Sequence, residues 1–360
     1  MAASVPPMKI AVLHYQPSGD PVDPVVDHIC EALHALGHTT QTVGVHNRVV
    51  DLLKLIEDAR ADLVFNVCET FADDYRLEVN VAAVMEMAGI KFTGSGTAGL
   101  LLAQDKVLTK QLLEYHEVLT PNFVTFDEDT FETFGRLAFP LIVKPARSDA
   151  SMGIGKHSVV KDWDELQKRV RDIRKTYNDE AFAEEYIDGR EVYVGVIGSA
   201  TRAEILPVVE LDWGNWKAGE PKVSDRTVKF AEVTEGSPLL EMAQNLSPDL
   251  LARIERSALL AFRALKIRDY ARVDFRISAS TNEPYILEVN PNPYLENESE
   301  LAMGAAERGI NYTQLIGRII DSAASRYQLK TNKERTVTGE TPMVEAVKEA
   351  KEPKEAGNRG

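Results

Sequence analysis

The sequence predicts an α/β protein with a parallel sheet in its N-terminal part, because short apolar runs alternate there with segments of helical apolar spacing. Lys9–Tyr15 is a short apolar run of strand length, and Thr39–Val45 and Asp62–Val67 are also predicted to be strands. Between them, Val25–Leu36 and Val49–Ala59 have the apolar spacing of amphipathic helices. Strands that alternate with helices imply right-handed crossovers and a parallel, Rossmann-like sheet. Ligands of such sheets bind beyond the carboxyl ends of the strands.

The rest of the chain is predicted to be more varied. A helix is expected at Leu77–Ala88, a flexible link that forms the first domain boundary at Thr93–Gly99, and a helix around Gln104–Tyr115. Short strands then predominate, with one amphipathic helix among them: Leu141–Lys144, Lys156–Val160, Ala181–Glu185, Glu191–Ile197, the helix Leu250–Leu265, Arg272–Ile277 and Tyr285–Val289. The last two strands are joined by a short polar turn and are expected to form a hairpin.

This pattern predicts three folded units and a tail. The expected units are a Rossmann-like N-terminal domain over residues 1–97, a central subdomain over 98–183, a C-terminal subdomain over 184–327 and a charged tail over 328–360. From Lys330 onward the chain loses aromatic residues and periodic apolar spacing, which is typical of a solvated, disordered terminus. An interaction tail is the alternative interpretation.

Composition and charge narrow the range of partners. The formal charge is −15, from 41 basic and 56 acidic residues, whereas nucleic acids and anionic membrane surfaces both attract clustered Lys and Arg. We therefore expect neither as a partner. The two cysteines, Cys30 and Cys68, lack metal-ligand spacing, and the N-terminus carries no signal peptide, so a reducing, cytoplasmic location is expected.

A set of charged side chains is predicted to share one face of the C-terminal hairpin. Side chains alternate along a strand, so Arg272, Asp274 and Arg276 point to the same face, as do Glu288 and Asn290 on the next strand. Two carboxylates and an amide oxygen are ligands that suit Mg²⁺ together with phosphate oxygens. An exposed strand face with ordinary salt bridges is the alternative.

Two segments upstream have the composition of a phosphate and nucleoside site. The apolar strand at Leu141–Lys144 ends on a lysine and is followed by the small, polar loop Arg147–Gly155, whose backbone N–H groups can approach phosphate oxygens. Ala181–Glu191 places Glu184, Glu185 and Glu191 around a bend, where carboxylates can bind an adenine amino group and ribose hydroxyls. A hairpin turn and a solvated hairpin are the simpler interpretations of these two segments.

Taken together, these segments resemble the ATP-grasp superfamily, and within it the D-alanine–D-alanine ligase-like branch. The matching text is TGSGTAGLLLAQDKVLTK at 93–110, FPLIVKPARSDASMGIG at 139–155, AFAEEYIDGRE at 181–191 and ARVDFRI…PYILEVNPNPYL at 271–295. The resemblance implies a Rossmann-like N-terminal domain followed by a two-part ATP-grasp fold. It also implies an ADP-forming carboxylate–amine ligase that uses ATP and Mg²⁺ (or Mn²⁺).

The resemblance implies a role for each matching residue. Those assigned to ATP are Lys106 and Lys144 for the phosphates, Ser151 and Gly153 in the lid over them, Glu184, Glu185 and Ile187 around the adenine, and Glu191 at the ribose. Those assigned to the metal are Asp274, Glu288 and Asn290. Those assigned to catalysis and substrate are Arg272 at the oxyanion, Lys229 and Ser151 on the phosphate side, and Ser299 at the acceptor carboxylate.

Around the substrates, the sequence departs from the ligase pattern. The family's first-strand loop with its glutamate is replaced by His14–Pro24, and its His-Gly segment by Cys68–Tyr75. Ala150 replaces the first lid serine, and Phe230 the tyrosine after the mobile-loop lysine. We therefore expect a ligase of amino-acid or short-peptide substrates that does not make D-Ala–D-Ala efficiently. An ester-forming ligase and a non-catalytic ATP-binding module are the alternatives, and a homodimer, common in this family, is a further expectation.

Overall fold

The N-terminal part is built on a three-stranded parallel sheet. The computed structural model describes residues 6–17, 19–126, 137–148, 152–225, 228 and 237–329. Strands β1 (Lys9–Tyr15), β2 (Thr39–Val45) and β3 (Leu63–Val67) pair in the order β2-β1-β3, all parallel. The parallel, Rossmann-like sheet predicted from the sequence is confirmed.

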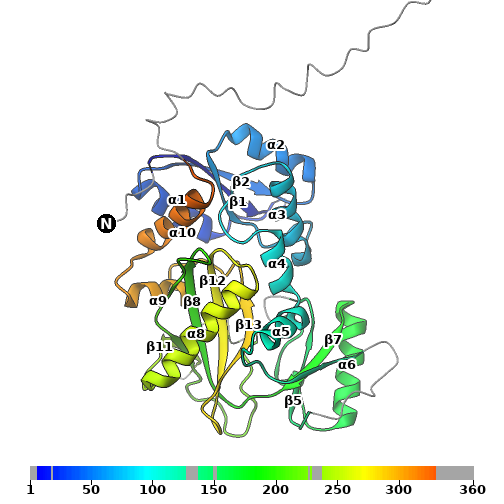
Figure 1. Ribbon diagram of the computed structural model, residues 1–360. Helices are drawn as coiled ribbons and strands as arrows, with labels where there is room; N and C mark the ends of the chain where they lie inside the picture. Colours follow the sequence, from blue (N-terminus) through cyan, green and yellow to red (C-terminus); the bar gives the residue numbers. More distant parts are fainter. Residues whose placement is uncertain are drawn as a thin grey trace, which may run out of the picture.

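Helices cover both faces of this sheet, as Figure 1 shows. Alternation along β1 sends Ile10 and Val12 into the core beneath α1 (Pro24–Ala35) and α10 (Tyr312–Arg326). Ala11 and Leu13 point the opposite way, into the core shared with two other helices. These are α2 (Val49–Ala59) and α3 (Glu78–Met87), the latter preceded by the 3₁₀ turn η1 (Tyr75–Leu77).

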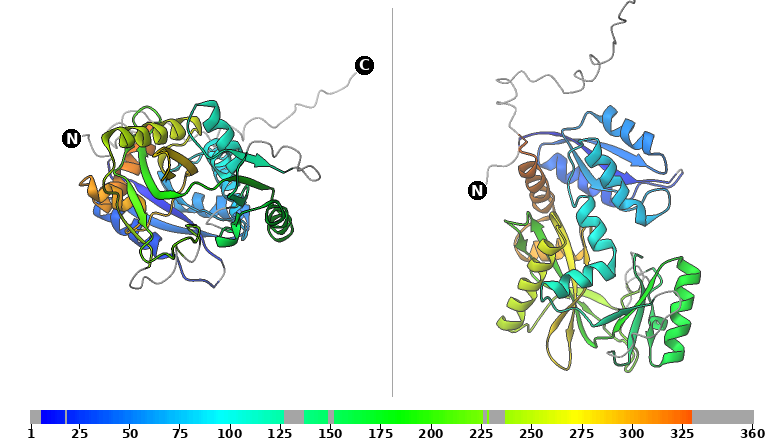
Figure 2. Two further views of the ribbon diagram at one scale, coloured as in Figure 1. Left: turned by 90° about the horizontal axis from the view of Figure 1, so that it is seen from below. Right: turned by 45° about the vertical axis from the view of Figure 1, so that its right-hand side comes forward.

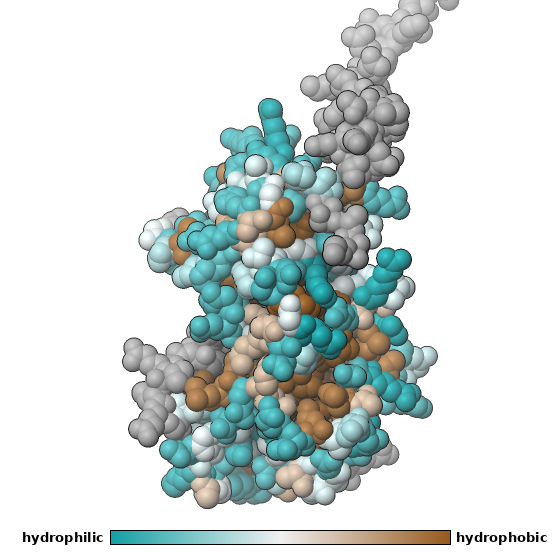
Figure 3. Space-filling view, turned by 90° about the vertical axis from the view of Figure 1, so that its left-hand side faces the viewer, coloured by the Kyte–Doolittle hydropathy of each residue, from teal (hydrophilic) through white to brown (hydrophobic). Residues whose placement is uncertain are grey.

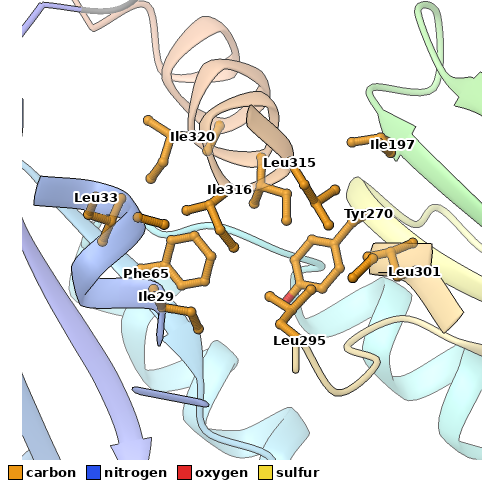
Figure 4. Packing of buried hydrophobic residues seen from close by; sticks show 14 of the residues in the cluster. Ile29, Leu33, Phe65, Ile197, Tyr270, Leu295, Leu301, Leu315, Ile316 and Ile320 are labelled. Atoms are coloured by element: carbon orange, nitrogen blue, oxygen red, sulfur yellow. The ribbon is translucent and has the colours of Figure 1, made fainter. Parts of the chain in front are cut away.

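The first core joins the two ends of the chain. In Figure 4, Phe65 of β3 and Leu33 of α1 pack against Ile316 and Ile320 of α10. Tyr270 lies in the same cluster and comes from a strand of the C-terminal sheet. Burial of these side chains thus fixes the N-terminal sheet against the C-terminal part of the chain.

The segment between the N-terminal sheet and the rest is ordered and buried, so the flexible link predicted at Thr93–Gly99 is wrong. Thr93 and Ser95 are buried, and the Gly94 amide donates to Asp269 Oδ2 at 2.9 Å. Helix α4 begins at Thr97 and ends at Gln104, and α5 covers Lys106–Tyr115. The helix expected around residues 104–115 is α5, and a separate helix, α4, precedes it with one residue between them. Asp105 divides the two, because its carboxylate caps α5 by accepting from two of its amides.

The C-terminal part contains a largely antiparallel sheet. Its strands are β8 (Gly189–Gly198), β9 (Glu204–Ile205), β10 (Val209–Asp212), β11 (Leu239–Met242), β12 (Asp269–Ser278) and β13 (Pro284–Asn290), in the order β11-β10-β8-β12-β13 with β9 beside β8. Helix α8 (Pro248–Ala264) packs on one face, and α9 (Glu300–Glu307) follows β13. The predicted hairpin is confirmed as β12 and β13, which carry a bulge between Asp274 and Phe275.

A smaller sheet forms the third layer, set apart from the N-terminal sheet in the right-hand view of Figure 2. Strands β4 (Phe123–Thr125), β5 (Leu141–Pro145), β6 (Val159–Val160) and β7 (Ala181–Glu185) pair in the order β4-β7-β5-β6, with α6 (Trp163–Tyr177) packed on them. The strand predicted at Lys156–Val160 is mostly wrong. Residues Lys156–Ser158 form the 3₁₀ turn η2, closed by a bond from the Ser158 amide to the Gly155 carbonyl.

The surface carries both hydrophilic and apolar side chains. In Figure 3, hydrophilic side chains cover much of the face shown, and apolar ones gather in patches in its middle and lower parts. Among the described residues, none of the helices combines the length and apolarity that a membrane crossing requires. The charged tail expected from Lys330 lies outside the described residues.

Candidate active site

The hairpin β12–β13 gathers the predicted metal ligands on one face. The strand register places Asp274 opposite Glu288 and Arg272 opposite Asn290, so all four side chains share a face. Asn290 Nδ2 donates to Asp274 Oδ2 at 3.3 Å. The shared face predicted from the two-residue period is therefore confirmed by these contacts.

Arg272 is buried and held by two carboxylates. Its Nε and Nη2 donate to the two oxygens of Asp274 at 2.7 and 2.9 Å, and its Nη1 donates to Glu300 at 3.3 Å. The guanidinium also lies over the ring of Tyr193, 5.4 Å from its centroid. Burial alone would lower the pKa of Arg272, but Asp274 and Glu300 raise it well above its usual value. The group is thus a fixed cation, the property that an oxyanion-stabilising residue needs.

Lys106 connects two parts of the site. One is the strand face that carries Asp274, Glu288 and Asn290, called the metal face below because these are the predicted metal ligands; the other is Ser148, at the start of the predicted lid. Its Nζ lies 3.6 Å from Glu288 Oε2 and donates to the Ser148 carbonyl at 2.7 Å. Ser148 is itself bonded to Tyr75, whose hydroxyl lies 3.0 Å from Ser148 Oγ. Lys106 therefore sits where the N-terminal loop, the lid and the metal face meet.

Lys144, at the end of β5, points to the buried carboxylate of Glu184 on the neighbouring strand β7. Its Nζ lies 2.6 Å from Glu184 Oε1. A lysine at the end of a buried strand is costly unless its ammonium group meets an anion, and in the described residues that anion is Glu184. A third residue, Lys110 of α5, pairs with the other carboxylate oxygen. Burial favours the protonated carboxyl, but the two lysines outweigh it and hold the pKa of Glu184 below its usual range.

One pocket brings most of the predicted nucleotide residues together. Its lining combines apolar walls with both charges, and it contains Ile142, Lys144, Ile154, Glu184, Glu185, Tyr186, Ile187, Glu191, Lys222, Val223, Ser224, Asp274, Arg276, Leu287 and Glu288. An apolar slot with a few placed polar groups is typical of a site for a planar base and its sugar. Phosphates that extend from this slot would meet Lys144 and the metal face.

Glu191 is fixed on the floor of this pocket. Arg276 Nη2 donates to its Oε2 at 2.6 Å, and the Tyr193 hydroxyl donates to its Oε1 at 2.9 Å. Arg276 Nη2 also donates to the Lys222 carbonyl at 3.1 Å. The carboxylate is therefore oriented before any ligand arrives, as a ribose-binding acid requires.

The donor set of the metal face fits Mg²⁺. Asp274 and Glu288 supply carboxylate oxygens and Asn290 an amide oxygen, and such oxygen donors are the ligands that Mg²⁺ prefers. Asp274 faces Arg272, and Glu288 faces Lys106. Both carboxylates therefore already attract a cation, and a bound Mg²⁺ would be a further positive charge for them. Bound there, the ion would supply charge neutralisation at the phosphates. Among the described residues, no group of three or more His, Cys, Asp or Glu side chains is arranged to hold a metal ion, and this face offers two carboxylates and one amide.

The remaining predicted residues lie apart from these contacts or outside the described residues. Ser299 is the N-cap of α9: its hydroxyl accepts from the Ala302 amide and donates to the Glu296 carbonyl at 2.7 Å. Gly153 has a φ of +70°, and its carbonyl accepts from Arg169. Ser151 and Lys229 lie outside the described residues, as do the positions of the two substitutions Ala150 and Phe230.

The sequence interpretation gave no role to three residues of this site, one of which, Arg276, it had placed on the shared strand face. Lys110, Arg276 and Glu300 each pair with a residue that the motifs did indicate. A signal was present for two of them. Lys110 follows Lys106 by one helical turn, and Arg276 shares the strand face of Arg272 and Asp274. Glu300 showed no such signal, because it begins helix α9 and its partner Arg272 lies on strand β12.

The loops at the carboxyl ends of β1 and β3 approach each other beside this site. The Tyr15 hydroxyl donates to Asp73 Oδ1 at 2.5 Å, and His46 Nε2 lies 3.3 Å from Asp73 Oδ2. Asp74 is paired with Arg76 instead. These loops lie where parallel sheets bind ligands, at the carboxyl ends of their strands.

Comparison with known protein families and sequences identifies the family. The model for the D-ala D-ala ligase C-terminus matches residues 109–321. Protein y4sG from Sinorhizobium fredii, described as uncharacterized, is 34% identical over 322 residues, which are 87% of this chain and 92% of that protein. A D-alanine–D-alanine ligase from Bordetella petrii is 30% identical over 256 residues, 70% of this chain and 74% of the ligase.

Solved structures show the same fold. The D-alanine–D-alanine ligase from Bacillus anthracis, complexed with ATP, superimposes with a TM-score of 0.69 at 24% identity, over 89% of this chain and 99% of the ligase. The VanG D-Ala:D-Ser ligase from Enterococcus faecalis gives 0.68 at 21% identity, over 88% and 99%. The expected ATP-grasp fold is therefore confirmed. Because the family model matches more than half of the chain and a relative of known family agrees, this chain belongs to the D-alanine–D-alanine ligase family of ATP-grasp carboxylate–amine ligases, ADP-forming enzymes that use ATP and Mg²⁺.

Proposed function

We propose that this enzyme activates a carboxylate as an acyl phosphate and joins it to an amine, with amino acids or short peptides as substrates other than a pair of D-alanines. The observation that carries the proposal is the convergence of Lys144, Asp274 and Glu288 on one pocket, with Arg272 and Lys106 directly beside them. These are the groups that a phosphoryl transfer followed by an acyl transfer needs.

The chemistry follows from the charges of the site. A carboxylate is a poor electrophile, so ATP first converts it to an acyl phosphate, with ADP as the leaving group. Lys144 and Lys106 are positioned to neutralise the charge that develops on the transferred phosphoryl group. The amine then attacks the acyl carbon, and the resulting oxyanion lies within the field of the Arg272 guanidinium. A preorganised donor of this kind contributes roughly 3–4 kcal/mol to such a step.

The substrate specificity is inferred from the loops at the N-terminal sheet. Asp73 bonds to Tyr15, at the end of β1, and to His46, which follows β2, and the Tyr75 hydroxyl lies 3.0 Å from Ser148 Oγ. These residues replace the segments that the family uses for D-alanine. A site that has lost the hydrogen-bond partners of a polar ligand discriminates against it by several kcal/mol.

An ADP-release assay over a panel of carboxylate and amine pairs tests the proposal, with products identified by mass spectrometry. We expect ADP and phosphate in equal amounts with a new amide, and a hydroxamate when hydroxylamine replaces the amine. Rapid, saturable D-Ala–D-Ala formation from ATP, Mg²⁺ and D-alanine would overturn the specificity. Release of AMP and pyrophosphate would overturn the acyl-phosphate mechanism, because those products belong to adenylation.

The proposal includes a cytoplasmic location, where ATP and Mg²⁺ are supplied, and a homodimer. Sedimentation velocity of the full chain tests the dimer. A mass near the 39.9 kDa of one chain at micromolar concentration would count against it.

A further inference from the structure

Lys110 is a buried lysine that no sequence motif assigned to the site. Its side chain is 1% exposed, on α5 one turn after Lys106. Its Nζ pairs with Glu184 and donates to Thr120 Oγ1 at 2.6 Å, and Thr120 in turn donates to the Ile286 carbonyl at 3.0 Å. Lysine is almost never fully buried unless it is paired, because removing its charge from water costs free energy. The burial of Lys110 therefore points to a role that outweighs this cost.

Glu184 therefore lies between two lysines that come from different elements. Lys110 reaches it from α5 and Lys144 from β5, at 2.6 Å for the second. The two lysines differ in access. Lys144 lines the nucleotide pocket, whereas Lys110 lies behind it and is not part of the lining. Of the two, only Lys144 can turn its ammonium group to a ligand in that pocket.

A change of partner by Lys144 has a consequence for Glu184. If Glu184 had Lys144 alone, a phosphate could take that lysine only by leaving a fully buried carboxylate without a counter-ion. Removing one partner from a buried ion pair is strongly unfavourable. With Lys110 still in place, the carboxylate stays paired when Lys144 leaves it, and the exchange of partners becomes inexpensive.

We propose that Lys110 is a positioning residue of the nucleotide site, the permanent counter-ion of Glu184 that releases Lys144 to bind the phosphates of ATP. The proposal rests on the phosphate-binding role of Lys144 in the proposed function. It makes Glu184 a carboxylate shared between two lysines, in addition to the adenine-reading role that the family resemblance implies. Thr120 completes the arrangement by fixing the Lys110 ammonium from the other side.

Binding of Mg-ATP and of adenosine to the full chain, measured by calorimetry without other substrates, tests this role. Lys110→Met keeps the length of the side chain but removes the charge, so Glu184 should retain Lys144. Loss of a charge-assisted contact corresponds to an expected fall of about 10- to 100-fold in ATP affinity. Adenosine carries no phosphate, so its affinity should stay within about twofold.

The double variant Lys110→Met/Glu184→Gln is the decisive comparison. With no carboxylate to hold it, Lys144 is available again. Because Glu184→Gln also changes the adenine end of the site, the comparison uses the ratio of ATP affinity to adenosine affinity, which should return to within about threefold of the wild-type ratio. The double variant leaves no buried charge unpaired behind the pocket, so it also keeps the test valid if Lys110→Met alone does not fold. Thermal unfolding of each variant shows that the proteins compared are folded.

Several outcomes would overturn the proposal. The proposal fails if ATP affinity is unchanged in Lys110→Met, or if ATP and adenosine lose affinity equally. It also fails if the ratio of ATP affinity to adenosine affinity in the double variant stays as low as in Lys110→Met. A separate outcome concerns the proposed function. If Lys144→Met binds ATP as wild type does, the phosphate role of Lys144 fails, whatever Lys110 does.

Discussion

Gly189 offers a sharp test of how the nucleotide pocket is built. It opens β8, directly after the turn that carries Ile187, and has a φ of +151°. A Cβ added there would lie 1.9 Å from the Ile277 carbonyl oxygen and 2.9 Å from the Ala279 amide nitrogen. Both atoms are backbone of the adjoining β12 segment and cannot rotate away, so Gly189→Ala must shift one strand against the other.

The expected cost has two parts. A non-glycine residue in this backbone region costs about 1–3 kcal/mol, and overpacking costs about 1–3 kcal/mol more, so Gly189→Ala should destabilise by about 2–6 kcal/mol. Gly219→Ala is the matched control, because Gly219 also has a positive φ, of +81°, but no atom within 4 Å of an added Cβ. That control should cost only about 1–2 kcal/mol.

Urea unfolding of both variants, followed by intrinsic fluorescence, measures this difference. Because the chain has several structural units, the midpoints are compared directly rather than through a two-state free energy. Gly189→Ala should unfold at a clearly lower urea concentration than Gly219→Ala and should bind ATP more weakly, since Glu191 lies two residues away. Equal midpoints for the two variants would refute the argument that close approach of β12 requires glycine at this position.

Three further predictions concern Glu288, the tail from Lys330 and the Cys68 thiol. Glu288→Gln should lower phosphoryl transfer by more than about 100-fold, through lost charge stabilisation, with an unchanged thermal midpoint; normal ADP release with a true substrate pair would exclude Glu288 as a metal ligand. Truncation before Lys330 should leave kcat/KM within about twofold, a change below ~0.5 kcal/mol, and a large loss of activity or solubility would show that the tail packs on the core. Burial, with Glu78 and Glu69 nearby, raises the pKa of the Cys68 thiol to about 12, so the thiol stays protonated in the native protein. Cys68 should therefore resist iodoacetamide at pH 8 in the native protein and react with it in urea. Rapid alkylation of the native protein would contradict this.

The sequence predicted best those features that depend on local periodicity. Arg272, Asp274, Glu288 and Asn290 were placed on one face because side chains alternate along strands, and the register of β12 and β13 bears this out. The parallel N-terminal sheet followed in the same way from alternating strands and helices. These patterns depend only on the order of neighbouring residues in the chain, so no tertiary information is needed to interpret them.

The missed features depend on contacts between distant segments. Lys110 could be seen beside Lys106 in the sequence, but its partner Glu184 lies 74 positions later on another element. The packing of α10 against α1 joins the two ends of the described chain, and the buried segment at Thr93–Gly99 was mistaken for a flexible link because its glycines and small residues have a linker composition. Composition indicates that such a backbone can be flexible, but contacts with distant residues bury this segment and hold it in one conformation.

The charges of the site explain why it can be built before ATP arrives. In the described residues, Glu191 is paired with Arg276, Asp274 with Arg272, and Glu184 with two lysines. Such pairs avoid the cost of isolated buried charges and hold each side chain in one orientation. In the role proposed for Lys110, ATP binding is an exchange of partners, in which phosphate oxygens replace carboxylate oxygens at Lys144. On that proposal the affinity for ATP depends on how well the released carboxylate of Glu184 is still neutralised, so a cation behind the pocket controls binding without touching the nucleotide.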